Sequence, residues 1–168
     1  MPMPRINPEI ETFARIKVVG VGGSGQNAID HMIRSKVPGV DFVAVNTDAQ
    51  DLHNSLAPRK IHIGKNVTRG LGAGMDPMLG RQAAEENKNE LTELVRGVDM
   101  VFITGGLGGG TGTGAAPVVA DLARAEGALT IGVVTRPFSF EGSERGRIAE
   151  EGLSRLREAV DAMIVIPN

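Results

Sequence analysis

Apolar and polar residues alternate along this chain in short blocks that predict strands and helices in turn. Short apolar runs bounded by polar residues or glycine are typical of buried strands. Such runs lie at residues 15–21, 42–45, 60–63, 98–104, 129–135 and 162–166. Between them, apolar residues recur at helical spacing, which predicts helices. These helices span about residues 26–36, 50–54, 77–96, 111–126 and 143–160.

Strands that alternate with helices at short spacing predict an α/β fold, a three-layer Rossmann-like arrangement with a mainly parallel sheet and helices on both faces. The short alternating run at residues 60–63 is expected near an edge of that sheet. Residues 1–14 carry three prolines among mostly polar residues and predict an N-terminal arm, followed by one domain over residues 15–168. Ligands of such sheets bind at the carboxyl ends of the strands, where the strand order reverses.

The most glycine-rich stretch lies between a predicted strand and a predicted helix. Residues 105–114 read GGLGGGTGTG, and seven of these ten residues are glycine. Glycine lets a ligand approach the backbone closely, and a helix that follows offers free N–H groups and partial positive charge to phosphate. Thr111 and Thr113 add hydroxyls that can bond a phosphate or cap the helix. A flexible linker would have polar flanks, so the stretch predicts a phosphate-binding turn.

A second glycine turn follows the first strand, where Gly20, Gly22 and Gly25 match the G-x-G-x-x-G pattern of dinucleotide-binding folds. Asp48, after the second strand, lies about where such folds place a ribose-binding acid. A dinucleotide-binding module is therefore one alternative. It is disfavoured because that pattern needs only one glycine turn, and because no His or Tyr lies in a catalytic pattern.

The chain lacks the G-x-x-x-x-G-K-[ST] motif by which conventional GTPases and ATPases bind triphosphates. Its one Gly-Lys pair, Gly64 and Lys65, is followed by Asn66. A bound triphosphate would therefore depend mainly on backbone N–H groups. We expect Mg²⁺ to offset part of the phosphate charge through the nucleotide and its own waters, without a direct protein ligand.

Composition and charge argue against several other classes of function. The net charge is −2, and the chain has no long basic stripe and no Trp or Tyr, so we expect no nucleic-acid partner. It has no cysteine, which leaves no disulfide framework or thiolate metal site and is compatible with the cytoplasm. No apolar run approaches the length of a membrane span, so we expect no membrane insertion.

Glu141 and Arg145 follow the loop at residues 136–140, and the residues alone leave two interpretations open. The two side chains lie four positions apart at a predicted helix start, where a surface ion pair contributes little. Alternatively, Glu141 accepts a hydrogen bond from a ribose hydroxyl, and Arg145 contacts the ribose or a phosphate.

Taken together, several stretches resemble the FtsZ family, the tubulin-like GTPases of bacterial cell division. GTGTG at residues 110–114 is similar to the signature of the tubulin family. KVVGVGGSGQNA at residues 17–28, NTDAQDL at 46–52, TRGLGAG at 68–74 and TRPFSFEG at 135–142 also resemble this family in order and spacing. The resemblance covers nearly the whole chain after the arm.

The resemblance implies a GTP- or GDP-binding domain and a set of residues near the nucleotide. These residues are Gly22, Gly23, Ser24, Gly25, Gln26, Asn27, Gly72, Ala73, Gly108, Gly109, Gly110, Thr111, Gly112, Thr113, Pro137, Glu141, Arg145 and Asn168. Asn27 would lie near the ribose and base, and Gly72 and Ala73 near the γ-phosphate. Residues 108–113 would hold the α- and β-phosphates.

On the ribose side the resemblance implies contacts from Glu141 and Arg145, which favours the functional interpretation of that pair. Asn168 would begin the contacts to guanine. Ser24 and Gln26 depart from the family, which often has Gly and then Gly or Asn at these positions. Ser24 would tighten the turn or add a hydroxyl to the phosphate site.

The resemblance also implies subunits that stack head to tail into filaments, in the cytoplasm at the division site. The family continues with a central helix that stacks on guanine, a loop whose acidic residues complete hydrolysis in the next subunit, and a second domain. We expect residues 1–168 to lack all three, and therefore to contain no catalytic residue. The chain alone is then expected to bind GTP or GDP weakly or not at all and not to hydrolyse GTP, and other division proteins would bind the missing regions.

A second alternative is a nucleotide-binding module that caps an intact filament without supporting its growth. Without the central helix, we also expect an exposed apolar patch near residues 163–166. Such a patch would favour dimerisation, domain swapping or aggregation.

Overall fold

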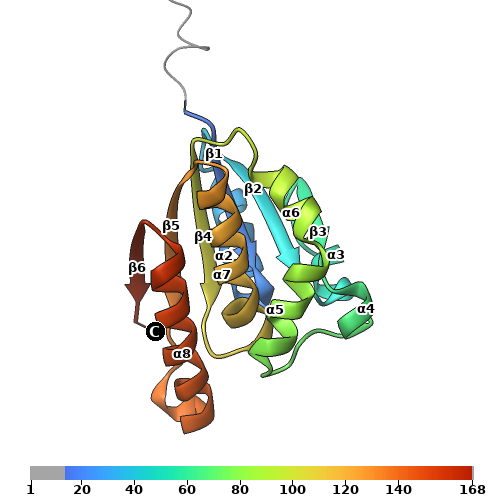
Figure 1. Ribbon diagram of the computed structural model, residues 1–168, viewed down its shortest axis with the longest axis vertical. Coiled ribbons are helices and arrows are strands. Elements are labelled where there is room, and N and C mark those ends of the chain that lie inside the picture. Colours follow the sequence, from blue (N-terminus) through green and yellow to red (C-terminus); the bar gives the residue numbers. More distant parts are fainter. Residues whose placement is uncertain (1–13, 168) are drawn as a thin grey trace, which may run out of the picture.

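The computed structural model describes residues 14–167, which form a parallel sheet between two layers of helices (Figure 1). The strands are β1 (Ile16–Val21), β2 (Asp41–Asn46), β3 (Arg59–His62), β4 (Met100–Gly106), β5 (Leu129–Thr135) and β6 (Ala162–Ile166). The helices are α2 (Gly22–Arg34), α3 (Ala49–His53), α4 (Lys65–Thr68), α5 (Pro77–Glu86), α6 (Lys88–Val95), α7 (Gly110–Ala125) and α8 (Ser143–Ala159), with a 3₁₀ turn η1 (Ser139–Glu141). The predicted α/β fold is confirmed, whereas the arm lies outside the described residues except for Ala14.

The strand order is β3-β2-β1-β4-β5-β6, and all neighbouring strands are parallel. At the centre, Val19 of β1 pairs with Val43 of β2 on one side and with Ile103 of β4 on the other. The chain therefore builds one half of the sheet outward from β1, and then returns to build the other half from β4. The carboxyl ends of β1 and β4 flank the point where the order reverses, which is where such sheets bind ligands. As predicted, β3 is an edge strand.

Each face of the sheet has its own core, because successive side chains of a strand point to opposite faces. Val18 packs with Ile29 and Phe42 under α2 and α3, whereas Val19 faces the larger core under α5, α6, α7 and α8 (Figure 1). The larger core includes Val19, Val21, Val43, Val45, Ile61, Ile103, Leu91, Leu94, Val119 and Leu156. Burying one such side chain stabilises the fold by about 1.5–3 kcal/mol.

Two helix boundaries differ from those expected. Helix α2 begins at Gly22 instead of Gln26, so the second glycine turn forms the first turn of the helix. The single helix predicted over residues 77–96 is two helices, α5 and α6, separated by Asn87. The Asn87 Oδ1 atom accepts a hydrogen bond from the Gly64 N–H at 2.9 Å, and Asn87 itself leaves helical geometry. Asn side chains commonly compete with helix hydrogen bonds in this way.

Other expectations about local structure are confirmed. Asp76 caps α5 by accepting hydrogen bonds from the N–H groups of Met78 and Leu79, with Pro77 as the first helical residue. On the edge strand β6, Ile164 is 54% exposed and Ile166 is 45% exposed. The predicted exposure of apolar side chains near residues 163–166 is therefore confirmed for these two. Met163 and Val165 instead pack against the core. Self-association through this edge stays a prediction. No helix within residues 14–167 is both long and apolar enough to cross a membrane.

Helices α5 and α8 pack directly against the first turn of α7, with almost no side chain between them. A Cβ atom added at Gly114 of α7 would overlap with the carbonyl oxygen of Pro77, and one added at Gly80 of α5 would overlap with that of Gly110. On the other side, a Cβ at Gly152 of α8 would overlap with the Thr113 side chain. Glycine at these positions therefore fixes the helix whose N-terminus reaches the centre of the sheet.

This packing predicts that Gly114→Ala destabilises the protein, even though Ala favours helix. The added methyl group must push α5 away from α7, at a cost of about 1–3 kcal/mol. Gly146→Ala in α8 is the matched control, because nothing lies within 4 Å of a Cβ there. It should stabilise by up to about 1 kcal/mol. Urea unfolding of both variants checks this, and equal effects would contradict the packing argument.

Candidate functional site

A cavity of about 280 Å³ lies at the carboxyl ends of β1, β4 and β5, beside the reversal of strand order. Its walls come from both glycine turns and from the loops after β3 and β5. The lining residues are Val21, Gly22, Gly23, Ser24, Gly74, Gly106, Leu107, Gly109, Gly110, Thr111, Gly112, Thr135, Pro137, Glu141 and Arg145. Stretches that are far apart in sequence therefore meet at one site, as expected.

Two helix N-termini open into this cavity. Helix α2 begins at Gly22 and α7 begins at Gly110, and both residues line the cavity. Gly22 has φ +76°, and a Cβ there would lie 3.1 Å from the Gly112 N atom, so the two turns abut. Neither helix has a side-chain N-cap or an acidic residue in its first turn. The Gly110 N–H already donates to the Gly74 carbonyl. The other N–H groups of the two first turns, with the partial positive charge of the helix ends, are placed to meet an anion.

Most of the glycine stretch at residues 105–114 belongs to a strand or a helix. Strand β4 continues through Gly106 and α7 starts at Gly110, so only residues 107–109 form the turn. The Leu107 N–H donates to the Thr135 carbonyl at 2.9 Å, and the Gly110 N–H donates to the Gly74 carbonyl at 2.7 Å. The buried Gly108 N–H donates to Thr113 Oγ1 at 2.9 Å. Hydrogen bonds to β5, to the loop before α5 and to α7 thus fix the position of the turn.

Loops on either side complete the walls. The loop that ends at Gly74 is tied to the end of β2, since the Ala49 N–H donates to the Gly70 carbonyl at 3.1 Å. On the other side, the Glu141 Oε2 atom accepts a hydrogen bond from the Phe138 N–H at 2.6 Å, which closes the loop after β5. Glu141 and Arg145 both line the cavity, and within residues 14–167 they form no ion pair with each other.

Several of the residues predicted to contact nucleotide lie behind the cavity wall. Gly25 packs against the backbone of Gly20, and Thr113 is buried beneath the turn. The buried Gln26 donates to the Asp51 carbonyl at 2.6 Å and accepts from Asn46 at 3.1 Å. These three residues support the wall from behind.

The other predicted residues lie around the same loops. Asn27 is exposed on α2, and Ala73 is buried beside the cavity. Gly72 has φ +94° and faces Thr47 and Asp48. Asn168 lies outside the described residues.

Some lining residues were not among those predicted to contact nucleotide, although they lie within the glycine stretch or the stretches that resemble the family. Val21, Gly106 and Thr135 are the last residues of β1, β4 and β5. Their position at strand ends was the available signal. Ser24 was predicted, and the structure gives its position a reason: a Cβ added at Gly106 would lie 2.6 Å from Ser24 Oγ. The serine therefore fits beside a glycine that leaves room for it.

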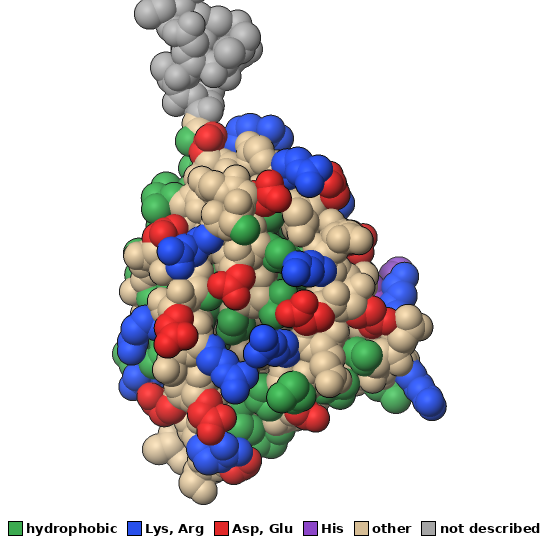
Figure 2. Space-filling model, viewed as in Figure 1, with side chains coloured by type: hydrophobic (Ala, Val, Ile, Leu, Met, Phe, Trp, Pro, Cys, Tyr) green, Lys and Arg blue, Asp and Glu red, His purple; other side chains and the backbone are tan. Residues whose placement is uncertain are grey.

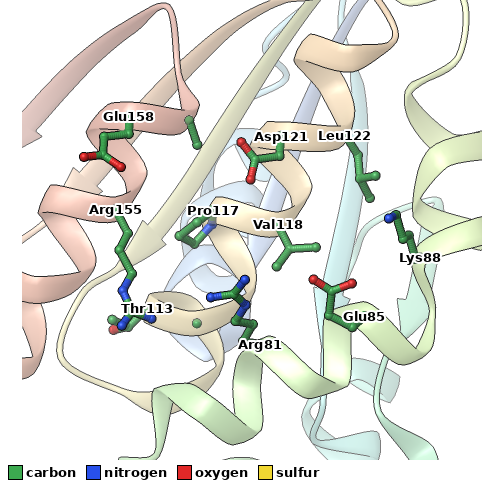
Figure 3. Close-up of a pocket in the computed structure, with 12 residues that line it drawn as sticks. Arg81, Glu85, Lys88, Thr113, Pro117, Val118, Asp121, Leu122, Arg155 and Glu158 are labelled. Carbon is green, nitrogen blue, oxygen red and sulfur yellow. The ribbon is translucent and has the colours of Figure 1, made fainter.

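A larger cavity, of about 420 Å³, lies on the helical face between α5, α7 and α8 (Figure 3). Arg81 and Arg155 extend toward the first turn of α7, whereas Asp121 and Glu158 lie toward the other end (Figure 3). Acidic and basic side chains alternate over this whole face (Figure 2). The cavity has neither a glycine turn nor an open helix N-terminus, so the smaller cavity is the stronger candidate for phosphate.

The model of the Tubulin/FtsZ family, GTPase domain, matches residues 15–168. The structure of an empty FtsZ dimer from M. jannaschii is similar to this chain, with 51% sequence identity and a TM-score of 0.92. The match covers 95% of this chain and 46% of that one. GDP-bound CetZ1 from Haloferax volcanii is 31% identical with a TM-score of 0.83, covering 92% of this chain and 51% of that one.

CetZ2 from the same organism, solved as a GTPγS-bound protofilament, is 28% identical with a TM-score of 0.79. It covers 91% of this chain and 49% of that one. The chain thus spans about half the length of the solved structures to which it is similar. These similarities do not favour the dinucleotide-binding alternative.

The hydrogen bond that holds the central turn can be tested through Thr113. Thr113→Val keeps the side-chain shape but leaves the buried Gly108 N–H without an acceptor, at a cost of about 1–3 kcal/mol in the free energy of unfolding. Thr113→Ser should retain most of the stability. Thr92→Val is the control, because the Thr92 hydroxyl bonds only to the Lys88 carbonyl at the surface of α6. Urea unfolding, with amide exchange at Gly108, measures the difference; unchanged exchange would contradict the assignment.

Proposed function

This chain belongs to the Tubulin/FtsZ family and carries its GTPase domain, and we propose that the cavity at the carboxyl ends of β1, β4 and β5 binds the phosphates of GTP or GDP. The observation that carries the proposal is the meeting, at one cavity, of two helix N-termini that have neither a side-chain cap nor an acidic residue in the first turn. Such an arrangement binds phosphate through backbone N–H groups. It removes the need for the lysine of the conventional triphosphate motif.

Side chains play a smaller part in this proposal. Arg145 is the one cationic side chain that lines the cavity within the described residues. With Glu141 and Pro137 it lies on the side of the loop after β5, and we assign this side to the ribose. Gly72, Ala73 and Gly74 lie on the opposite side, and we assign them to the γ-phosphate. Asn27 and Asn168 are assigned to the ribose and base from the family resemblance alone.

Magnesium fits the site only as a companion of the nucleotide. No group of three His, Asp or Glu side chains within residues 14–167 is placed to hold a metal ion. Mg²⁺ keeps several waters and commonly binds through substrate phosphates. We therefore propose that the phosphates and waters hold the ion, which supplies positive charge beside the phosphates, while the two helix N-termini orient the chain of phosphates.

Hydrolysis needs a group that activates water, and we propose that the residues described around this cavity do not supply one. Glu141 is the one carboxylate that lines it within the described residues, and its Oε2 atom already accepts from the Phe138 N–H. We propose that this chain alone does not hydrolyse GTP, and that acidic residues of a neighbouring subunit complete the reaction when subunits stack head to tail.

Exposed apolar side chains near the cavity support stacking. Leu71 is 82% exposed on the loop before α5, and Phe140 is 81% exposed on the loop after β5. Phe140 stacks on Phe138 at 4.9 Å between ring centroids, which makes one apolar surface. We propose that a second subunit covers these residues, in a filament that acts in the cytoplasm at the division site. The similar CetZ2 structure is a protofilament.

Nucleotide binding is tested by titrating the 168-residue chain with GTP, GDP and NAD⁺ in equilibrium dialysis. We expect weak binding of GTP and GDP, no response to NAD⁺, and about tenfold weaker GTP binding in Arg145→Ala, since hydrogen bonds to charged groups have about this effect. Arg147→Ala is the control. Its guanidinium bonds to Glu144 at 2.6 Å and Glu151 at 2.9 Å, and the bond to Glu144 lowers the pKa of that carboxyl. Equal GTP affinity in the two variants would argue against the assignment of Arg145.

Turnover is tested by measuring phosphate release from GTP over a range of protein concentrations. We expect none above the rate in buffer with Mg²⁺, because the described residues place no free carboxylate in the cavity. A rate that rises in proportion to protein concentration would disprove the claim that the chain alone is inactive, and would leave the binding proposal intact.

A further inference from the structure

A partly buried hydrogen bond at the cavity wall joins two hydroxyls that are distant in sequence. Thr47 Oγ1 and Thr111 Oγ1 lie 2.7 Å apart. Thr47 follows β2 and is fully buried, with 0% exposure. Thr111 is the second residue of α7 and lines the cavity. Thr47 does not line the cavity, and its hydroxyl is bonded to a residue that does, Thr111.

The backbone of Thr47 is held on both sides. Its N–H donates to Asn46 Oδ1 at 2.8 Å, and Asn46 Nδ2 in turn donates to the buried Gln26 at 3.1 Å. The Thr47 carbonyl lies 2.8 Å from His62 Nε2, at the end of β3. The backbone of Thr47 is thus held by residues of α2, β2 and β3.

Burial decides which of the two hydroxyls donates. Among residues 14–167, the one hydrogen-bond partner of the Thr47 hydroxyl is Thr111 Oγ1. If Thr111 donated, the Thr47 hydrogen would be buried without an acceptor, which is costly. Thr47 therefore donates, and Thr111 accepts. The Thr111 hydrogen must then point elsewhere, and the side of Thr111 that remains open is the cavity.

We propose that Thr47 is a positioning residue, which holds the Thr111 hydroxyl so that its hydrogen is directed at a phosphate oxygen of the bound nucleotide. This inference rests on the proposed function and deepens it, because it adds one oriented side-chain donor to a site made largely of backbone N–H groups. A hydroxyl that donates to an anionic oxygen forms a stronger bond than one between neutral groups. A fixed orientation also lowers the entropy that binding must offset.

The test is a double-mutant cycle on GTP affinity, measured by equilibrium dialysis with the 168-residue chain. Thr111→Val removes the donor and should weaken GTP binding about tenfold or more. Thr47→Val leaves the Thr111 hydroxyl in place but free to rotate, and should weaken binding about three- to tenfold. In the Thr111→Val background, Thr47→Val should have less than about a twofold further effect, because there is no hydroxyl left to orient.

Two controls separate positioning from general stability. Thr47→Ser keeps the donor and should restore affinity to within about twofold of the unaltered chain. Thr130→Val makes the same change at another fully buried threonine, whose hydroxyl donates to the Ala128 carbonyl at 3.1 Å, away from the cavity. It should lower the urea midpoint as Thr47→Val does, but leave GTP affinity unchanged.

Each other outcome has a definite meaning. Unchanged affinity in Thr47→Val, or effects of the two Val substitutions that simply add, would overturn the positioning role while leaving nucleotide binding in place. An equal loss of affinity in Thr130→Val would also overturn it, since stability alone would then explain the effect. If the unaltered chain bound no GTP at all, the proposed function would fail, and the inference that rests on it would fail too.

Discussion

The whole structure depends on the close backbone packing around the first turn of α7. Pro77 and Gly80 of α5 contact one side of this turn, and Gly152 of α8 contacts the other. Because glycine or backbone atoms occupy these contacts, the turn has little room to shift. Its N-terminus therefore stays beside the carboxyl ends of β1 and β4 before any ligand arrives. A phosphate site made from backbone N–H groups needs this rigidity, since no flexible lysine side chain is present to follow the ligand.

The same constraint explains why glycine gathers where it does. The glycine stretch at residues 105–114 was predicted to form a turn, yet Gly106 ends a strand, and Gly112 and Gly114 lie inside a helix. A Cβ at Gly112 would lie 2.8 Å from the Gly106 carbonyl oxygen. These glycines thus serve close packing, and conformational freedom is needed only in the short turn between strand and helix, where Gly108 has φ +111°.

Features that depend on local pattern could be predicted from the sequence, whereas features that depend on distant partners could not. Apolar runs and helical spacing predicted every strand and the α/β fold, and the glycine turns predicted where a cavity lies at the strand ends. The break between α5 and α6 was missed because Asn87 bonds to Gly64, which is 23 residues earlier. The pair of Thr47 and Thr111 was missed for the same reason, since 64 residues separate them. Predicted contacts such as Gln26 and Thr113 proved to lie behind the wall, because a motif does not show which way a helix turns its side chains.

Binding and hydrolysis make different physical demands on this site. Binding phosphate needs fixed N–H groups and positive potential, which the two helix N-termini supply within one domain. Hydrolysis also needs a group that activates water, and an acidic side chain held beside the γ-phosphate would repel the phosphates and offset the positive potential of the helix N-termini. In the proposed mechanism the acid comes from a second subunit, so its charge meets the phosphates only when subunits stack. Electrostatics would then couple GTP hydrolysis to assembly, because the domain that binds the phosphates does not itself carry the acid beside the γ-phosphate.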